Sequence, residues 1–289
     1  MVLTDILRLI GLLLSSFGTL VLAAVGLAII FGMMRIINLA HGEFIMIGAY
    51  STAFSFHAGA PLFAAVLIGG IVTGIVGVVL ERLIIRHLYD RLVDSMVATW
   101  GISLIFAQGM LIIAGPSFND IPTPFGPISY AGFSMSLYRI VLAVLAVVLL
   151  MSLYVVYKYT RYGRHARATM QDEETARSLG VNTDRIYMIT FFIGSVMAGI
   201  AGGLFAPIVS IVPTLGQSYI IEAFVTVIVA GPSVILGTIL SGLSLSMVNA
   251  PASQLAGSFA GRVALLVAAI VIIRVLPEGI SGYWMGERN

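Results

Sequence analysis

Long runs without a charged side chain dominate this sequence and limit what it can fold into. The runs free of Asp, Glu, Lys and Arg include Leu9–Met34, Phe44–Leu80, Ser95–Asn119, Ile140–Tyr157, Ile186–Ile221, Ala223–Gly261 and Val263–Ile273. A helix needs about 20 apolar residues to cross the hydrocarbon core of a bilayer. The second, fifth and sixth of these runs can each hold two membrane segments, or one span and a half-helix. The pattern predicts about 8 transmembrane helices, within a range of about 8–10, some of them broken or re-entrant.

Composition agrees with a lipid environment. The chain is 59% hydrophobic and 10% charged, whereas soluble domains carry about 25% charged residues. Backbone polar groups in lipid must be satisfied internally, so only helices or a closed barrel can span it, and barrel strands would alternate in polarity. We therefore predict an all-α polytopic membrane protein, with residues 1–289 forming a single transmembrane domain. The first run is too long for a signal peptide and is expected to be a retained span.

The sequence lacks the motifs that a membrane enzyme would need. It contains no cysteine, which excludes disulfides and cysteine-based metal sites. It has no phosphate-binding loop, serine-hydrolase elbow or zinc-protease motif, and its four histidines are scattered. We expect no catalytic residue, metal or cofactor in this chain.

Two charged loops predict which side of the membrane they face. Glu81–Asp94 contains three arginines and Lys158–Arg185 contains six basic residues, so together they hold nine of the 15 Lys and Arg. Basic loops stay in the cytoplasm. Two predicted spans, Ser95–Ala114 and Leu137–Tyr157, separate the loops, which is consistent with both lying on the cytoplasmic face.

Proline and glycine mark irregular or closely packed segments. Gly115–Ser136 contains four prolines and one charged residue, so we expect an irregular outward-facing loop. Gly231-Pro232 interrupts an apolar run and predicts a broken helix or re-entrant turn. Small residues at four-residue spacing, such as Gly70 and Gly74, favour close helix packing within the chain.

The second charged loop holds the most informative soluble feature. Asp172, Glu173 and Glu174 lie where acidic residues stabilise the start of a short helix, and Gly180 can end that helix in a left-handed cap. A short helix at the cytoplasmic surface would suit the docking of a soluble partner. An ordinary solvated loop is the alternative.

The run from Asn38 to Glu43 is the strongest polar anomaly among the apolar segments. It places the hydrogen-bonding side chains of Asn38, His41 and Glu43 between two apolar runs. Within a bilayer such groups must face protein or a water-filled pathway, and Gly42 would allow a helix break. We interpret the run as part of a pathway or gate, with a polar turn at the interface as the alternative.

Further polar residues lie inside apolar runs. Thr99, Ser103 and Gln108 follow roughly helical spacing, so they either line the pathway or form hydrogen bonds between helices. Glu222 is an isolated acid. It is either a functional carboxylate within the membrane or a carboxylate at the outer boundary.

Two of these segments resemble a known family. The run Asn38-Leu-Ala-His-Gly-Glu-Phe-Ile-Met-Ile-Gly-Ala-Tyr50 resembles the signature of branched-chain amino acid ABC transporter permeases. Glu174-Thr-Ala-Arg-Ser-Leu-Gly180 is similar to the E-A-A-x-x-x-G coupling motif, with Thr175 in place of the first Ala. The resemblance covers nearly the whole chain. It implies an ATPase-coupling segment over about 163–185, with contact residues Arg164, Arg167, Asp172, Glu173, Glu174, Ala176 and Gly180.

Three segments look closest to the urea-transporter branch of this family: Glu81–Tyr89, Ala98–Ile105 and Gly216–Phe224. The third carries a Glu where that branch usually has Asp. Two segments depart from the family pattern, because Ala230–Val234 lacks the Asn of G-G-x-G-N and Leu276–Ser281 replaces R-P-x-G-L-F. Basic residues at membrane depth are scarce, which favours a neutral solute over a zwitterion.

The resemblance implies a permease subunit of an ABC importer for urea or a related short amide, forming half of the translocation pathway in a bacterial inner (plasma) membrane. A homologous second permease would complete the pathway, two cytoplasmic ABC ATPase subunits would use ATP and Mg, and an extracytoplasmic binding protein would deliver substrate. The chain would contact lipid and no nucleic acid. One alternative is the same machine for branched-chain amino acids. Another is a stand-alone urea channel or a secondary carrier, for which Glu222 is the best candidate coupling-ion site.

Overall fold

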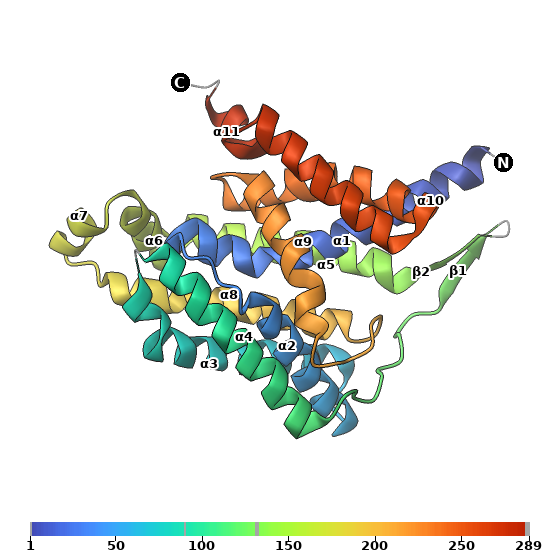
Figure 1. Ribbon diagram of the computed structural model, residues 1–289, viewed down its shortest axis with the longest axis horizontal. Helices are drawn as coiled ribbons and strands as arrows, with labels where there is room; N and C mark the ends of the chain where they lie inside the picture. The colour runs from blue at the N-terminus through green and yellow to red at the C-terminus, as the bar shows by residue number, and fades with distance from the viewer. Residues whose placement is uncertain (1, 90, 131–132, 287–289) are drawn as a thin grey trace. The chain divides into compact units, whose positions relative to one another are not determined.

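The computed structural model describes the backbone of all residues except 1, 90, 131–132 and 287–289, and the side chains of residues 8–89, 91–127 and 135–283. The described chain is mostly helical, in the order that Figure 1 traces from blue to red. It divides into two compact units, which are treated separately below. Unit 1 comprises Met1–Ala24, Pro122–Leu149 and Ile221–Asn289, and unit 2 comprises Val25–Ile121 and Leu150–Ile220.

Six of the described helices are long and apolar enough to cross a membrane. They are α1 (Val2–Met34), α3 (Leu62–Leu83), α4 (Leu92–Ala114), α5 (Leu137–Tyr159), α8 (Thr183–Phe205) and α10 (Val234–Val275). α10 is two helices that meet at Ala256 and Gly257, where the backbone leaves the helical region. Beyond this turn Gly261 lies against Ser253 and Asn249, so the two halves form a hairpin.

Two shorter helices, α2 (His41–His57) and α9 (Leu215–Ala230), accompany the long ones. α2 follows a non-helical segment after α1, and α9 ends at Gly231-Pro232, as the sequence predicted. The described residues confirm an all-α polytopic membrane protein with broken segments, with six helices of spanning length and α9 as a shorter apolar helix.

The centre of unit 2 is a body of three helices, α2, α3 and α8, that pack closely through glycine. A Cβ on Gly48 would lie 2.2 Å from the Gly199 carbonyl oxygen, and a Cβ on Gly202 would lie 1.8 Å from that of Ile45. The predicted packing positions Gly70 and Gly74 also contact α8 side chains. Small residues therefore let these backbones approach one another, as expected within a membrane.

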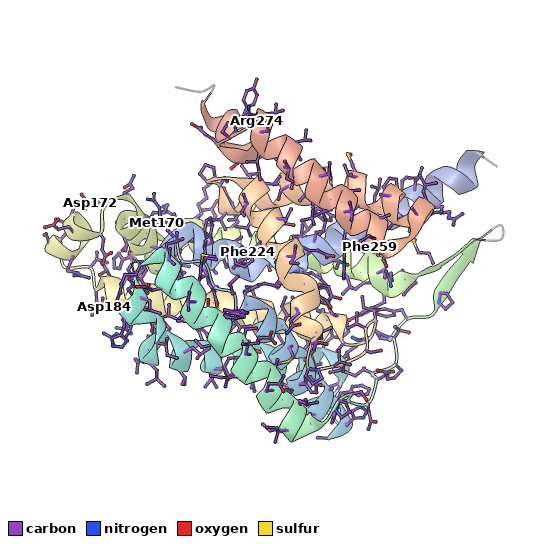
Figure 2. All side chains as sticks on the ribbon, viewed as in Figure 1. Met170, Asp172, Asp184, Phe224, Phe259 and Arg274 are labelled. Carbon is purple, nitrogen blue, oxygen red and sulfur yellow. The ribbon has the colours of Figure 1, made fainter. Side chains whose placement is uncertain are left out.

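Both charged loops lie at the same end of unit 2, as predicted. One contains the short 3₁₀ helix η1 (Ile85–Leu88), and the other contains α6 (Arg161–Gln171) and α7 (Glu173–Ser178). Arg86 of the first loop lies 3.8 Å from the Asp184 carboxylate at the start of α8, and the rings of Tyr89 and Tyr187 are 5.0 Å apart. Figure 2 labels Asp172 and Asp184 at this end.

Unit 1 has its own apolar core and its own broken segment. Its core cluster consists of Leu20, Val229, Leu245, Leu265 and Ala269. The α9–α10 break has Gly231 at φ +78°. Ser281, in α11 (Gly279–Gly286), stabilises it by donating to the Ala230 carbonyl at 2.6 Å and accepting from the Ser233 N–H at 3.0 Å.

The predicted irregular loop Gly115–Ser136 is partly regular. β1 (Pro127–Tyr130) and β2 (Phe133–Ser136) form an antiparallel ribbon in which Pro127 pairs with Ser136. The four prolines suggested irregular backbone throughout, but proline is tolerated at the first residue of a strand. Aromatic and β-branched residues such as Ile128 and Tyr130 then favour extended backbone.

Candidate functional site

The polar run before α2 lies in a genuine interruption of the membrane helices. α1 ends at Met34, Arg35 has φ +52°, and helical structure resumes at His41. Asn38 Oδ1 accepts from the Ala40 N–H at 3.0 Å, and the Asn38 carbonyl accepts from the His41 N–H at 3.2 Å. An Asn that bonds to its own backbone in this way competes with helix formation, so the chain turns here.

The expected role of Gly42 as the site of the break is wrong. Gly42 lies inside the first turn of α2, and the break precedes it. Its lack of a side chain serves close packing instead, because a Cβ there would lie 2.4 Å from the carbonyl oxygen of Gly216, near the start of α9. The first turns of α2 and α9 are therefore in backbone contact within unit 2.

α4 contributes two hydroxyl groups to this polar segment. Thr99 Oγ1 accepts from the Leu39 N–H at 3.0 Å, and Ser103 Oγ donates to Glu43 Oε1 at 2.9 Å. Four predicted pathway residues thus gather in one buried cluster, which we call the polar cluster: Asn38, Glu43, Thr99 and Ser103. His41 is buried next to them in the chain, but its ring lies against Gly26 of α1.

Two atoms of the polar cluster are buried without a protein partner. Among the described residues, neither Asn38 Nδ2 nor Glu43 Oε2 has a hydrogen-bond partner, and both side chains are 1% exposed. Burying an unpaired polar group costs about 1–3 kcal/mol. Polar atoms held in this way are suited to a solute or water that occupies the cluster in another state.

The other two predicted pathway residues do not join the polar cluster. Gln108 is exposed on α4, about 140° around the helix from Ser103 at 100° per residue. Glu222 belongs to unit 1, where Arg262 Nε donates to its carboxylate at 3.1 Å. Within the described residues, no group of His, Asp or Glu side chains is arranged to hold a metal ion.

The predicted coupling segment forms two short helices with defined caps. Thr160 caps α6 by accepting from the Gly163 N–H at 3.1 Å, and Asp172 caps α7 by accepting from the Thr175 N–H at 2.9 Å. Asp172 accepts from the backbone N–H of Thr175 and also from its hydroxyl. Both bonds, the backbone one having the larger effect, hold the pKa of Asp172 below its usual value. Gly180 ends α7 at φ +87°, as predicted for a left-handed cap.

Glu173 joins α7 to α8. Its Oε1 accepts from Arg177 at 2.8 Å and from the Thr183 hydroxyl at 3.1 Å, and its Oε2 accepts from the Tyr187 hydroxyl at 2.8 Å. α6 is joined to α8 separately, through the Tyr162 and Thr190 hydroxyls at 2.8 Å. Burial raises the pKa of Tyr162 to about 12. The predicted coupling segment is therefore hydrogen-bonded to α8 at two places.

The remaining predicted coupling residues divide into buried and exposed groups. Ala176 is the buried residue of α7, whereas Arg167 is exposed and donates to the Tyr157 carbonyl. Arg164 and Glu174 are exposed. Leu179, which the sequence reasoning did not single out, is 80% exposed beside them. An exposed leucine among charged residues at the membrane surface is suited to contact with another protein.

Sequence reasoning missed several partners of the predicted residues. Some of these partners are far along the chain from the groups that they contact, and others have no feature that distinguishes them from neighbouring residues. They are Tyr187, Thr183, Arg262 and Gly216. The isolation of Glu222 in an apolar run was the one available signal, since a buried carboxylate is costly unless it is paired or protonated.

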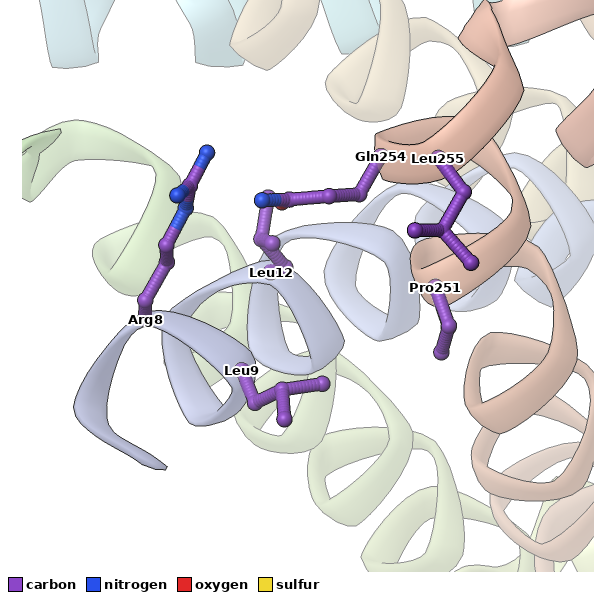
Figure 3. Close-up of a pocket in the computed structure, with 6 residues that line it drawn as sticks. All are labelled: Arg8, Leu9, Leu12, Pro251, Gln254 and Leu255. Carbon is purple, nitrogen blue, oxygen red and sulfur yellow. The ribbon is translucent and has the colours of Figure 1, made fainter. Parts of the chain in front are cut away.

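Unit 1 contains a cavity of about 280 Å³ between the start of α1 and the turn of α10 (Figure 3). It is lined by Arg8, Leu9, Leu12, Pro251, Gln254 and Leu255. The Arg8 guanidinium nitrogens lie 2.5–3.3 Å from the side-chain oxygen of Gln254 in its accepting orientation. The cavity contains none of the predicted site residues.

The sequence matches a family of transport proteins over most of its length. The family model described as "Branched-chain amino acid transport system / permease component" matches residues 9–276. The chain belongs to this family. It is therefore a permease component, and the prediction of a multi-pass inner-membrane protein is confirmed.

Named relatives agree with this assignment. The high-affinity branched-chain amino acid transport system permease protein LivH of Escherichia coli (strain K12) is 29% identical over 282 residues, covering 91% of both chains. BraD of Pseudomonas aeruginosa, with the same description, is 29% identical over 91% of this chain and 92% of its own. A probable LivH of Methanocaldococcus jannaschii is 26% identical, over 91% and 88%. No solved structure matches this chain.

The comparisons support the family but not its urea-transporting branch. The three segments that suggested a urea-type member therefore lack support, and the branched-chain amino acid alternative agrees better with the relatives.

Proposed function

We propose that this chain is a permease subunit of an ABC importer for branched-chain amino acids, with the two units acting as one transmembrane domain over residues 1–289. The family supports the transport role. The single structural observation that carries the coupling role is the pair of hydrogen bonds that the Thr183 and Tyr187 hydroxyls donate to the Glu173 carboxylate. They make a surface helix mechanically continuous with a long membrane helix.

The surface of the coupling segment is suited to an ATPase subunit. Arg164, Glu174 and Leu179 are exposed and offer two charges and one apolar side chain. On α7, Ala176 is buried, and Glu173 accepts the hydrogen bonds from Thr183 and Tyr187 that join the segment to α8. Force that an ATPase subunit applies to this exposed surface would thus be transmitted to α8.

From α8 the displacement reaches the polar cluster through packed glycines. Gly199 and Gly202 of α8 lie against Gly48 and Ile45 of α2 with no room for a Cβ. α2 carries Glu43 in its first turn. Movement of α8 therefore shifts α2 relative to α4, to which it is linked by the Ser103–Glu43 hydrogen bond.

The partners follow from this role. A homologous second permease would complete the pathway, two cytoplasmic ATPase subunits would bind ATP and Mg, and an extracytoplasmic protein would deliver the amino acid. Lipid would surround the exposed apolar side chains of α3, α4 and α5. The cavity at Arg8 has one cation and apolar walls, so it would suit a phospholipid headgroup region.

A secondary carrier is less well supported. It would use Glu222 to bind a coupling ion, but that carboxylate is already paired with Arg262. A paired carboxylate has less affinity for a cation, since its charge is compensated.

Reconstitution tests the proposal. The chain would be placed in liposomes with its second permease, the ATPase subunits and the binding protein, and uptake of leucine and of urea would be compared. We expect leucine uptake that requires ATP and every subunit. Uptake of urea by this chain alone, without ATP, would contradict the proposal.

A further inference from the structure

The N-terminal ends of two helices meet inside unit 2. Gly42 is the second residue of α2 and Gly216 is the second residue of α9, and each leaves room for the other's backbone, with Cβ positions only 2.4 Å from the neighbouring glycine. No side chain caps α2, whose N-cap residue is Ala40. Two positive helix ends therefore converge at one place.

Converging helix ends require negative charge nearby. Each helix N-terminus carries roughly half an elementary positive charge, so the two ends together amount to about one positive charge. When the Glu43 side chain is ionised, as it would be opposite a substrate ammonium group, it supplies one negative charge in the first turn of α2. In that state the site is close to neutral overall but contains separated charges, which is the electrostatic complement of a zwitterion.

Two buried side chains have unused hydrogen-bonding capacity at this point. Asn38 Oδ1 accepts from the N–H of Ala40, the N-cap residue of α2, so its amide lies at the helix end. Within the described part of the chain, its Nδ2 and the Oε2 of Glu43 have no partner, and both side chains are 1% exposed. One unused atom is a donor and the other is a charged acceptor.

We propose that the meeting point of the α2 and α9 N-termini is the amino-acid zwitterion site of the translocation pathway. Glu43 accepts from the substrate ammonium group, held in orientation by Ser103. Asn38 Nδ2 and the two helix ends bind the substrate carboxylate, as half-helix N-termini do in other membrane transporters. The inference rests on the proposed function and assigns the residues that recognise its substrate.

Helix-dipole compensation by itself does not account for this arrangement. Glu43 would offset the dipole with either oxygen, yet only Oε1 is bonded, to Ser103. A capping side chain at residue 40 would serve the helix better, since Ser or Asp there typically contributes about 1 kcal/mol. Urea would also not require charges, because it is neutral.

The absence of cysteine from this chain allows a direct test. Ala107 lies one turn beyond Ser103 on the buried side of α4 and is 4% exposed. Ala107→Cys would introduce the only thiol in the chain, and its modification by N-ethylmaleimide in the complete reconstituted importer is measured after the subunits are separated. Leucine, 4-methylpentanoate, which lacks the ammonium group, isopentylamine, which lacks the carboxylate, and urea are compared as protecting solutes.

We expect leucine to slow the modification, and each of the other three solutes to need at least about tenfold higher concentration, as expected for loss of a charged hydrogen bond. Adding Glu43→Gln should remove the advantage of leucine over 4-methylpentanoate, and adding Asn38→Leu should remove its advantage over isopentylamine. Ser195→Ala, which deletes a buried hydroxyl on α8 outside the cluster, should leave protection unchanged.

Equal protection by all four solutes, or no modification of the introduced thiol in any state, would overturn the site. If ATP-driven leucine uptake persists in that case, the site fails and the proposed function stands. If uptake is also absent in the unmodified importer, the proposed function fails as well.

Discussion

Tyr187 donates a hydrogen bond to the Glu173 carboxylate at 2.8 Å, and this bond connects a surface helix to a membrane helix. The Thr183 hydroxyl binds the other oxygen of the same carboxylate. Glu174, one residue further along, is exposed. We therefore predict different roles for these adjacent acids. Glu173 holds α7 against α8, and Glu174 contacts the ATPase subunit.

Glu173→Ala should uncouple transport while the ATPase subunits stay bound. Losing the bonds to Thr183 and Tyr187 should lower ATP-driven uptake about tenfold, which corresponds to about 1.4 kcal/mol. Uptake, ATP hydrolysis and co-purification are measured on the reconstituted complex. Glu174→Ala is the matched control and should weaken co-purification instead. Identical effects of the two substitutions on all three measurements would contradict these roles.

Gly42→Ala should destabilise the protein because its Cβ would lie 2.4 Å from the Gly216 carbonyl oxygen. Overpacking of this kind costs about 1–3 kcal/mol. Gly109→Ala on α4 is the control, since nothing lies within 4 Å of its Cβ position, and a helical Gly→Ala change gains up to about 1 kcal/mol. Thermal unfolding in detergent should rank Gly109→Ala, the unsubstituted protein and Gly42→Ala in falling order. Equal midpoints for the two variants would show that α2 and α9 do not meet as described.

The sequence predicted the helical class, the breaks and the coupling helix well, because these depend on local signals. Asn38 and Gly231 disrupt helices through their own backbone preferences, and Asp172 and Gly180 cap a helix through neighbouring residues. The structure brings together only some of the predicted site residues. Thr99 and Ser103 form hydrogen bonds with the polar run, whereas Gln108 does not join it. Spacing along the sequence could not distinguish these residues, because it does not show which face of α4 is covered.

The same limit explains why the partner of Glu222 was not predicted from the sequence. Its isolation suggested a functional carboxylate, but its partner Arg262 lies 40 positions along the chain in the second half of the α10 hairpin. Only the turn at Ala256 and Gly257 brings that arginine back. Long-range pairing of this kind leaves no periodic pattern in the sequence.

The Glu222–Arg262 pair should stabilise unit 1 rather than bind a transported ion. Glu222→Gln should lower stability by about 1–3 kcal/mol, between the values for exposed and buried pairs, because Arg262 is half exposed and Glu222 is 14% exposed. Exchanging the two residues, as Glu222→Arg with Arg262→Glu, should restore much of the unfolding midpoint and of leucine uptake. A swapped protein that unfolds normally but has lost uptake would assign Glu222 to transport.

The α7 cap should fail in acid. The pKa of Asp172 is lowered in the folded protein, so its stabilising effect is complete above the unfolded pKa of about 3.9 and is lost as the pH falls through the folded pKa. The protection of amides across residues 172–181, measured as their exchange rate relative to that of an unfolded chain at the same pH, should fall below about pH 4. Asp172→Asn keeps a capping oxygen that does not titrate, so its exchange should lack this acid transition. An identical pH profile for both proteins would remove Asp172 from the cap.

The central claim is that α6 and α7 receive force from an ATPase, and one measurement addresses it directly. Ser178 is exposed on α7 and is not a predicted contact residue, so Ser178→Cys would supply the only thiol in this chain without removing a contact. A short bifunctional reagent would be applied to the assembled importer with and without ATP. The account predicts a crosslink between position 178 and an ATPase subunit whose yield changes with nucleotide. No crosslink to an ATPase in any nucleotide state, or labelling of the thiol at position 178 by an impermeant reagent from outside the cell, would contradict it.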